Sequence, residues 1–377
     1  MRKLMGGLLV LLCIGGCEIP RERSDEAKKW DDEVDAWLAA VESSGGYLET
    51  SERPGETDVD ALISIRRPDQ VRIARRALLA TIWGKLELPE ALPTEKADPR
   101  MESFFQDVAS LANVQTLVIS MDLGLESIVA VLTPTEADDC AVIYHGDHDP
   151  SQRMKRHVGQ FLSVGCHVAV ISMPLRGPNP KPVFVSPRFG RLKLTRHDEM
   201  ALLDLEDGHP FKFFIEPVIV VVNYLRELLP DASIAMTGRS GGGWTTTLAA
   251  AIDPRIARSF PVAGSYPIHI RTDAPWDWGD WEQTVPEIYT VANYLELYLM
   301  GGYGRGRKQL QILNHFDPCC FSGIRSQEYE EFVARRLEQL GEGEFEVMRD
   351  LSHREHEISE AAMERILEEI KSEIDWP

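Results

Sequence analysis

The chain has 377 residues, 44% of them hydrophobic and 27% charged, so it carries enough apolar surface to bury a core, and global disorder is excluded. Its 40 lysines and arginines against 60 aspartates and glutamates give a formal net charge of −20. This balance argues against a broad nucleic-acid-binding face, which must neutralise phosphates, and any membrane attachment has to come from something other than a basic patch.

The first residues carry the pattern of an export signal. Arg2 and Lys3 precede an apolar run over residues 4–14, which is shorter than the ~20 residues of a spanning helix, so residues 1–16 are predicted to be a signal peptide. The run ends in small residues before Cys17, and this ending resembles the lipobox of bacterial lipoproteins. The resemblance implies acylation of Cys17 and a membrane-anchored lipoprotein of the bacterial cell envelope, facing the periplasm or the exterior. An ordinary secretory signal that happens to contain a cysteine is the alternative.

Residues 17–111 are predicted to form a mainly helical N-terminal extension. Apolar residues recur at helical spacing from Trp30 to Val41 and again over residues 70–86. Between the two helical patterns, residues 43–58 are rich in turn-forming residues, which predicts a linker.

From residue 114 onward, short β-branched segments alternate with helical ones. About eight segments are predicted to be strands, at 114–121, 126–134, 140–146, 167–174, 233–238, 258–264, 309–317 and 345–353. Helices are predicted at 150–165, 211–229, 241–252 and 326–341, and from residue 359 onward. Such alternation is typical of an α/β fold with a mostly parallel sheet covered by helices on both faces. An insertion at 266–307 follows the sixth strand.

Four cysteines remain beyond the predicted acylation site. Cys140 and Cys166 stand at the starts of two segments that are plausible neighbouring strands, but a disulfide needs Cα atoms within ~7 Å, so this bond is left open. The adjacent Cys319 and Cys320 lack the spacing of a zinc knuckle or a CxxC redox motif. We interpret them as small buried hydrophobic side chains.

The most informative motif is GRSGG at residues 238–242, between a predicted strand and a predicted helix. A serine at its centre stands on a sharp strand-to-helix turn, whose tight backbone needs small residues two positions to either side. In this context residues 112–377 resemble the α/β-hydrolase superfamily. The resemblance implies the α/β-hydrolase fold, with Ser240 as the nucleophile of a Ser-His-Asp triad. A glycine-rich turn that serves packing alone is the alternative.

The superfamily's chain order puts the acid after the nucleophile and the histidine last. Asp317 ends the predicted strand that follows the insertion and precedes a proline, which is the position that the resemblance implies for the acid. Some members carry the acid after an earlier strand, so Asp277, Asp280 and Glu282 in the insertion are alternatives.

The base is expected in the loop beyond the last predicted strand. Ser359 is a good N-cap for the final helix, so His356 falls just ahead of that helix, where the family's histidine commonly lies. His353 stays as the alternative. The two histidines are spaced as HxxH, but without a third histidine or a helix beneath both they do not indicate a metal site.

An oxyanion hole is implied at two backbone amides. Gly241 follows the nucleophile, and His145 with Gly146 matches the family's HG motif, whose next residue, Asp147, offers the second N–H. The Asp147 carboxylate would have to point away from the oxyanion. The same stretch partly matches a metal signature of metallo-β-lactamase-like hydrolases, but Ile143 stands where that signature has its first histidine. No metal and no organic cofactor are expected.

The insertion at 266–307 is rich in aromatic residues: Trp276, Trp278, Trp281, Tyr289, Tyr294 and Tyr298. Family lids sit over the serine at this point in the chain, so these side chains are expected either to line an acyl or sugar pocket or to form the core of the lid.

Together these patterns predict a serine hydrolase that cleaves a carboxylic ester through an acyl-enzyme intermediate. Its expected partners are a small-molecule or glycan ester and a membrane reached through the lipid anchor, with no nucleic acid. A peptidase or acyltransferase using the same triad is one alternative. A non-catalytic binding lipoprotein on a decayed hydrolase fold is the other.

Overall fold

The structure, a computed structural model, describes residues 57–146, 150–271 and 275–372, which belong to one compact unit. The predicted signal peptide, Cys17, the expected helix around Trp30 and the proposed oxyanion residue Asp147 lie outside these ranges. Among the described residues, no helix combines the length and the apolar character needed to cross a membrane.

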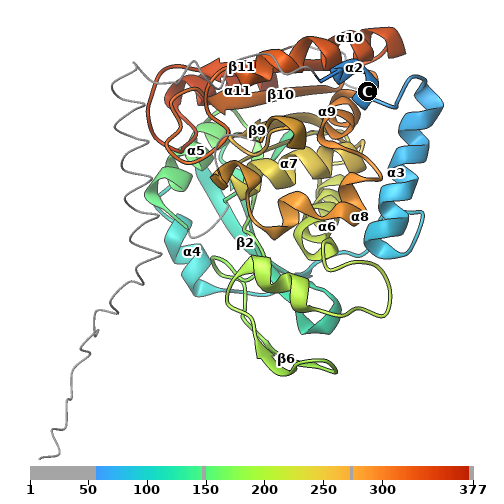
Figure 1. The fold of residues 1–377 in the computed structure, drawn as a ribbon. Helices are drawn as coiled ribbons and strands as arrows, with labels where there is room; N and C mark the ends of the chain where they lie inside the picture. The colour runs from blue at the N-terminus through green and yellow to red at the C-terminus, as the bar shows by residue number, and fades with distance from the viewer. Residues whose placement is uncertain (1–56, 147–149, 272–274, 373–377) are drawn as a thin grey trace, which may run out of the picture. The chain divides into compact units, whose positions relative to one another are not determined.

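A nine-stranded sheet forms the centre of the molecule (Figure 1). In spatial order its strands are β1 (Thr94–Glu95), β2 (Leu111–Ser120), β3 (Glu126–Pro134), β5 (His167–Ile171), β4 (Cys140–His145), β8 (Ser233–Arg239), β9 (Ile256–Val262), β10 (Lys308–Asn314) and β11 (Glu344–Asp350). The first three pairings, β1 with β2, β2 with β3 and β3 with β5, are antiparallel. Every pairing from β5 to β11 is parallel. All eight predicted strands are present. The two-residue β1 and the hairpin of β6 (Val183–Ser186) and β7 (Gly190–Lys193) were not predicted.

The strands are buried on both faces, and their side chains alternate between the two faces of the sheet. In β3, Val129 and Val131 contribute to the core on one face, whereas Ala130 and Leu132 contribute to the core on the other. The strands therefore read as nearly continuous apolar runs, as parallel sheets do when helices cover both sides.

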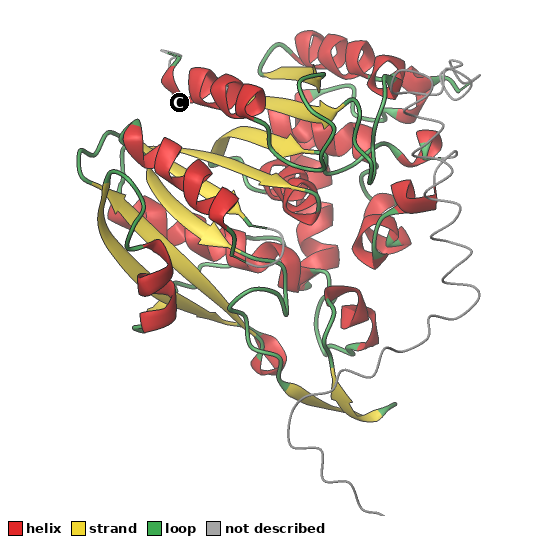
Figure 2. Ribbon diagram, turned by 90° about the vertical axis from the view of Figure 1, so that its left-hand side faces the viewer, coloured by secondary structure: helices red, strands yellow, loops and turns green. Residues whose placement is uncertain are grey.

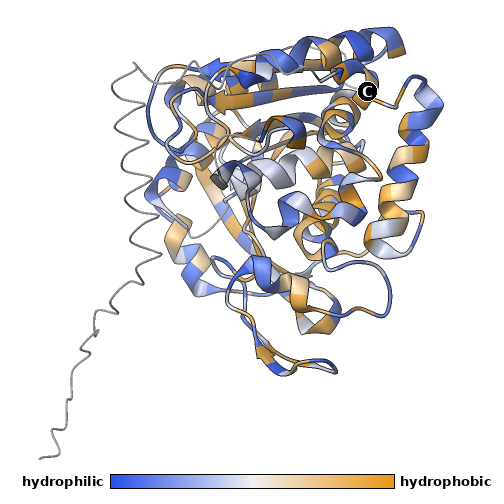
Figure 3. Ribbon diagram, in the orientation of Figure 1, coloured by the Kyte–Doolittle hydropathy of each residue, from blue (hydrophilic) through white to orange (hydrophobic). Residues whose placement is uncertain are grey.

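Helices cover both faces of the sheet, as Figure 2 shows. One face packs against α4 (Pro99–Phe105), α5 (Gln152–Ser163) and α11 (Glu360–Lys371). The other packs against α6 (Lys212–Leu228), α7 (Gly241–Ile252), α9 (Tyr294–Gly302) and α10 (Glu330–Leu340). Outer helices such as α10 and α11 alternate polar and apolar residues, so each turns an apolar stripe inward (Figure 3).

The N-terminal helices of the described chain pack on the same core. After the short α2 (Val59–Leu62), α3 (Pro68–Trp83) begins with a proline, which suits a first helical turn, and its apolar side chains join the core formed by α7 and α9. Figure 1 shows α3 beside α8 (Pro286–Tyr289). The partly buried guanidinium of Arg75 donates hydrogen bonds to carbonyls of α7 and α9, and burial lowers the pKa of Arg75 to about 10.

Aromatic residues of the segment between β9 and β10 divide into two groups. Tyr289, Tyr294 and Tyr298 are buried, and Tyr289 stacks on Tyr294 with ring centroids 4.6 Å apart. Trp244 of α7 donates a hydrogen bond of 2.8 Å to the Tyr289 hydroxyl. These tyrosines are core residues that fix the segment onto α7, whereas Trp278 is 46% exposed.

Two disulfides are present among the described residues. Cys140 and Cys166 are bonded across the starts of neighbouring strands, with Cα atoms 4.7 Å apart, which settles the open question in favour of the bond. Cys319 and Cys320 are bonded to each other, so our interpretation of them as small buried hydrophobic side chains is wrong. The sequence contained no spacing that distinguishes a bonded adjacent pair from two free thiols.

Candidate active site

Ser240 occupies the turn that joins β8 to α7. Its backbone has φ 57° and ψ −124°, a region that residues other than glycine rarely adopt. The turn is closely packed against the end of β4: a Cβ added to Gly242 would lie 2.6 Å from the carbonyl oxygen of His145, and one added to Gly238 would lie 2.7 Å from the backbone of Gly242. The GxSxG pattern thus provides the small residues that this turn requires.

The amide of Gly241, at the start of α7, has no acceptor within the helix. The Ser240 N–H donates to the Val262 carbonyl at 2.9 Å, and the Ser240 carbonyl accepts the Trp244 N–H at 2.9 Å, which begins the helix. The amide of Gly146 donates to Ile171 at 2.7 Å and is already occupied, while the amide of Asp147 lies outside the described residues.

Asp317 and His356 lie in contact although they are far apart in the sequence. Asp317 follows the end of β10, His356 lies in the loop between β11 and α11, and the Asp317 Oδ2 atom is 2.7 Å from Nδ1 of His356. The Asp317 side chain is fully buried. On the other side of the ring, Nε2 of His356 is buried and has no hydrogen-bond partner in the described part of the chain. The imidazole is therefore oriented through one nitrogen and available through the other.

The Asp317 carboxylate accepts four hydrogen bonds. Its Oδ1 accepts the backbone N–H groups of Cys319 at 2.8 Å and Cys320 at 3.3 Å, and its Oδ2 accepts from His356 and from Nδ2 of Asn314 at 3.1 Å. The same Asn314 amide donates to the carbonyl of Glu357, next to the histidine, at 2.9 Å. A carboxylate offers about four lone-pair sites, so this one is saturated.

Sequence reasoning missed Asn314, Cys319 and Cys320 as neighbours of the acid. One signal was present: an Asp followed by Pro can accept the amides two and three residues ahead in an Asx-type turn. No pattern in the sequence indicated the contribution of Asn314, because its contact depends on how β10 and β11 pair.

The alternative base and acids have other partners. His353 lies with Nε2 3.4 Å from the Asp350 carboxylate and Nδ1 3.5 Å from that of Glu355. Asp277 accepts the backbone N–H of Phe321 at 2.6 Å, and burial raises the pKa of Asp277 to about 6.

Asp280 and Glu282 flank a different histidine. His197 lies 3.5 Å from the Asp280 carboxylate and 3.4 Å from that of Glu282. Burial raises the pKa of Glu282, and the nearby carboxylates raise that of His197. Of the four acids considered, only Asp317 makes a hydrogen bond or ion pair with His356 that we observe.

The turn that holds Ser240 is tied to the loop that holds His356. Arg239, the residue before the serine, donates through Nη1 to the backbone carbonyl of His356 at 2.6 Å. This bond crosses from the end of β8 to the loop before α11. The two predicted catalytic segments are thus brought together at the carboxyl ends of the parallel strands, where α/β proteins place their ligand sites.

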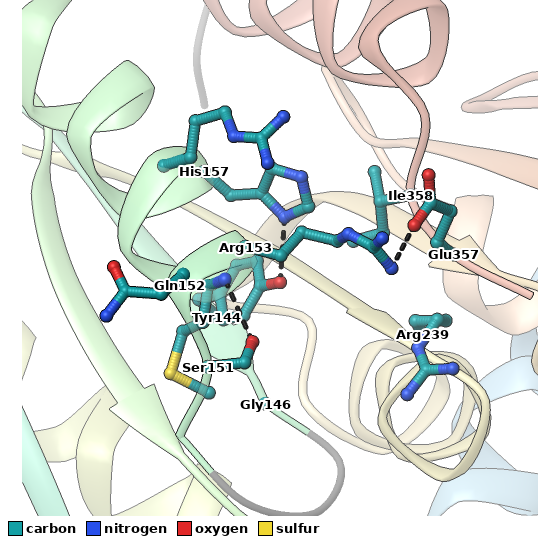
Figure 4. A pocket seen from close by; sticks show the side chains of 11 residues that line it. Tyr144, Gly146, Ser151, Gln152, Arg153, His157, Arg239, Glu357 and Ile358 are labelled. Carbon is teal, nitrogen blue, oxygen red and sulfur yellow. Dashed lines mark hydrogen bonds and ion pairs between the residues drawn. The ribbon is translucent and has the colours of Figure 1, made fainter.

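A cavity of about 480 Å³ lies beside these loops, between α5 and the end of β4 (Figure 4). Its lining includes Arg239 and Glu357, the chain neighbours of Ser240 and His356, but not the side chains of the three predicted triad residues. Arg153 forms an ion pair with Glu357 across it. At its wall the Tyr144 hydroxyl lies 2.9 Å from Nδ1 of His157, and burial lowers the pKa of His157 to about 4, which keeps that imidazole neutral at neutral pH.

Comparison with known proteins supports the same architecture. No family model and no curated protein sequence matches the chain. Among solved structures, acetyl xylan esterase 1 from Thermoanaerobacterium sp. JW/SL YS485 superposes with a TM-score of 0.53 and 14% identity, covering 84% of this chain and 98% of that one. The methylesterase BT1017 superposes with a TM-score of 0.51 and 15% identity, covering 89% and 67% of the two chains.

These likenesses establish the fold. The mostly parallel sheet flanked by helices, with a serine on the strand-to-helix turn after β8, is the α/β-hydrolase fold, as the sequence predicted.

Proposed function

We propose that the protein is a serine hydrolase that cleaves a carboxylic ester. One observation carries the proposal: the His356 imidazole is held by a buried carboxylate through Nδ1, leaves Nε2 without a partner, and lies in a loop bonded to the turn of Ser240. A serine hydroxyl is a weak nucleophile, and an imidazole oriented in this way is the base that activates it.

The reaction would proceed in two halves. Nε2 of His356 accepts the Ser240 hydroxyl proton as Oγ attacks the ester carbonyl, and Asp317 stabilises the resulting imidazolium. The oxyanion is stabilised by the N–H of Gly241 and, in our proposal, by that of Asp147. Collapse breaks the bond to the alcohol oxygen, which takes the proton from Nε2. Water then attacks the acyl-enzyme by the same proton transfers and releases the acid.

The substrate class is a small-molecule or glycan ester. Support comes from the two solved structures above, whose names describe an acetyl xylan esterase and a methylesterase. We further propose that Cys17 is acylated and that the enzyme acts at the bacterial cell envelope, on the periplasmic or exterior side.

Active-site labelling tests the proposed function. A fluorophosphonate should label the wild type and not Ser240→Ala, while Ser163→Ala, which removes an exposed hydroxyl at the end of α5, should label like the wild type. The wild type should also hydrolyse aryl acetates and acetylated sugars. Hydrolysis of amides in preference to esters would favour a peptidase, and transfer to an added alcohol in preference to water would favour an acyltransferase. A protein that neither labels nor hydrolyses would instead be a binding lipoprotein.

A further inference from the structure

A disulfide between adjacent cysteines lies directly beside the proposed acid and base. Cys319 and Cys320 are bonded to each other two and three residues after Asp317. Their two Sγ atoms and one ring nitrogen of His356 all lie within 4.8 Å of one another. The disulfide thus lies near the imidazole and belongs to the same chain turn as the carboxylate.

The backbone of the bonded pair supplies half of the hydrogen bonds on Asp317. Both amides point at one oxygen, Oδ1, at 2.8 Å from Cys319 and 3.3 Å from Cys320. Two consecutive N–H groups converge on one acceptor only in a restricted range of backbone conformations, and a covalent ring that includes both residues restricts that backbone further. Pro318, between the acid and the pair, also fixes the chain and has no N–H of its own.

The end of the same turn is fixed by a second carboxylate. Phe321 is buried with a φ of 57°, and its N–H donates to Asp277 at 2.6 Å. The turn is therefore held at Asp317 and at Phe321, with the disulfide between these two positions.

Restriction of the unfolded chain does not explain what this disulfide contributes to the protein. A cross-link stabilises a fold chiefly by restricting the unfolded chain, and the effect grows with the length of the loop that it closes. Cys319 and Cys320 are neighbours, so their bond closes the shortest possible loop, whereas Cys140 and Cys166 are 26 residues apart. The adjacent bond acts on local geometry, and the local geometry is that of the proposed acid and base.

We propose that the Cys319–Cys320 disulfide is a positioning element of the active site, which holds two backbone donors on the Asp317 carboxylate so that the carboxylate and the nearby His356 imidazole stay aligned. The inference rests on the proposed function. It also makes the activity sensitive to reduction. A dithiol gives two electrons and two protons to the bond, which opens to two thiols while the dithiol closes to its own disulfide. Cys319 is partly exposed, so a small reductant can reach it.

The two disulfides provide a matched pair of variants. In Cys319→Ser/Cys320→Ser we expect kcat for an aryl acetate to fall about 10- to 100-fold, the scale that misplaced catalytic groups cost, with KM within twofold of the wild type. Its thermal midpoint should stay close to that of the wild type. Cys140→Ser/Cys166→Ser removes a bond at the opposite ends of the strands, so kcat should be unchanged while the midpoint falls by roughly 5–10 °C.

Reduction gives a second measurement, in which the adjacent disulfide of the wild type is opened after the protein has folded, so the result does not depend on whether a cysteine variant folds. Each protein is treated with dithiothreitol, freed of it by gel filtration without oxygen, assayed, and then reoxidised. The wild type and Cys140→Ser/Cys166→Ser should lose activity and regain it, whereas Cys319→Ser/Cys320→Ser should not respond.

Unchanged kcat after verified reduction of the adjacent pair would overturn the inference. So would a loss that appears in KM alone, because the pair would then be part of the substrate pocket. An oxidised wild type that neither labels with fluorophosphonate nor hydrolyses esters would instead contradict the proposed function.

Discussion

Two histidines of one loop differ in the carboxylates that they reach. His356 is bonded to Asp317 on one nitrogen and leaves the other without a partner, whereas His353 lies between Asp350 and Glu355. Nε2 of each histidine is buried without a hydrogen-bond partner in the described part of the chain, but only His356 has a carboxylate at hydrogen-bond distance on Nδ1, whereas Nε2 of His353 faces the Asp350 carboxylate at 3.4 Å. The base should therefore be identifiable by replacing each histidine in turn.

We expect Ser240→Ala and His356→Ala each to lower kcat by about 10⁴ to 10⁶, because the members of a triad act as a unit. His353→Ala is the matched control and should retain most of the activity. Steady-state kinetics on an aryl acetate, with circular dichroism to verify folding, measures both effects. The opposite result, with His353→Ala inactive and His356→Ala active, would show that the base is His353.

Replacement of the acid tests the orientation of the ring. Asp317→Asn keeps the size of the side chain but favours the wrong imidazole tautomer, and we expect kcat to fall by about 10⁴. Asn314→Ala removes one donor from the same carboxylate and should cost about tenfold, the order of one hydrogen bond. Full activity in Asp317→Asn would move the acid to the segment that contains Asp277, Asp280 and Glu282.

Asp277 should make stability depend on pH. Burial raises its pKa to about 6 in the folded protein, above the reference value of 3.8. Its contribution to stability is therefore fully present below about pH 3.8 and is lost as the pH rises through 6. Asp277→Asn cannot titrate and can still accept the Phe321 N–H. Relative to the wild type, we expect it to gain about 1–3 kcal/mol between pH 4 and pH 8, measured by urea unfolding. An equal difference between the two proteins at both pH values would contradict this.

At the scale of elements, the active-site turn depends on how closely α7 approaches β4. Gly242 lies at the start of α7 against the His145 backbone, so an added methyl group has no space there. Gly159 is a helical glycine that is packed less tightly. In α5, a Cβ added to Gly159 would make an ordinary contact with Val108 at 3.4 Å.

We therefore expect Gly242→Ala to destabilise the protein by about 1–3 kcal/mol, as overpacking does, and to abolish activity. Gly159→Ala, the control, should be neutral or should stabilise the protein by up to about 1 kcal/mol, because alanine favours helix over glycine. Thermal unfolding and ester hydrolysis are measured together. Retained activity in Gly242→Ala would mean that the turn can shift without losing function.

At the scale of the whole molecule, sequence patterns predicted the eight long strands because each is a buried, β-branched run bounded by turns. They did not predict β1, whose two exposed residues, Thr94 and Glu95, carry no such pattern. Asp317 and His356 were named from their order in the chain, and the structure places them in contact; their catalytic roles stay a prediction. The sequence did not predict the bond between Cys319 and Cys320, because adjacent cysteines have the same spacing whether they are bonded or free.

Membrane attachment is the remaining prediction at this scale. Cleavage after residue 16 would leave a charge of −22, so binding would depend on acyl chains worth ~0.8 kcal/mol per buried CH₂. We expect the Cys17→Ser protein to be absent from the membrane fraction, or its signal peptide to remain uncleaved. A chain that begins after residue 17 should remain in solution and keep its esterase activity. If that shortened enzyme still pellets with membranes after a high-salt wash, the lipid-anchor proposal loses its support.

The packing of α3 has a practical consequence for producing the enzyme. The side chains of Val71, Leu78 and Ile82 are buried in the core that α7 and α9 also form. A shortened protein that begins at residue 112, where the strand-rich part of the sequence starts, would lack α3 and expose to water the apolar surface that α3 covers. Such a fragment is expected to aggregate on expression, whereas one that begins near residue 57 keeps that surface covered.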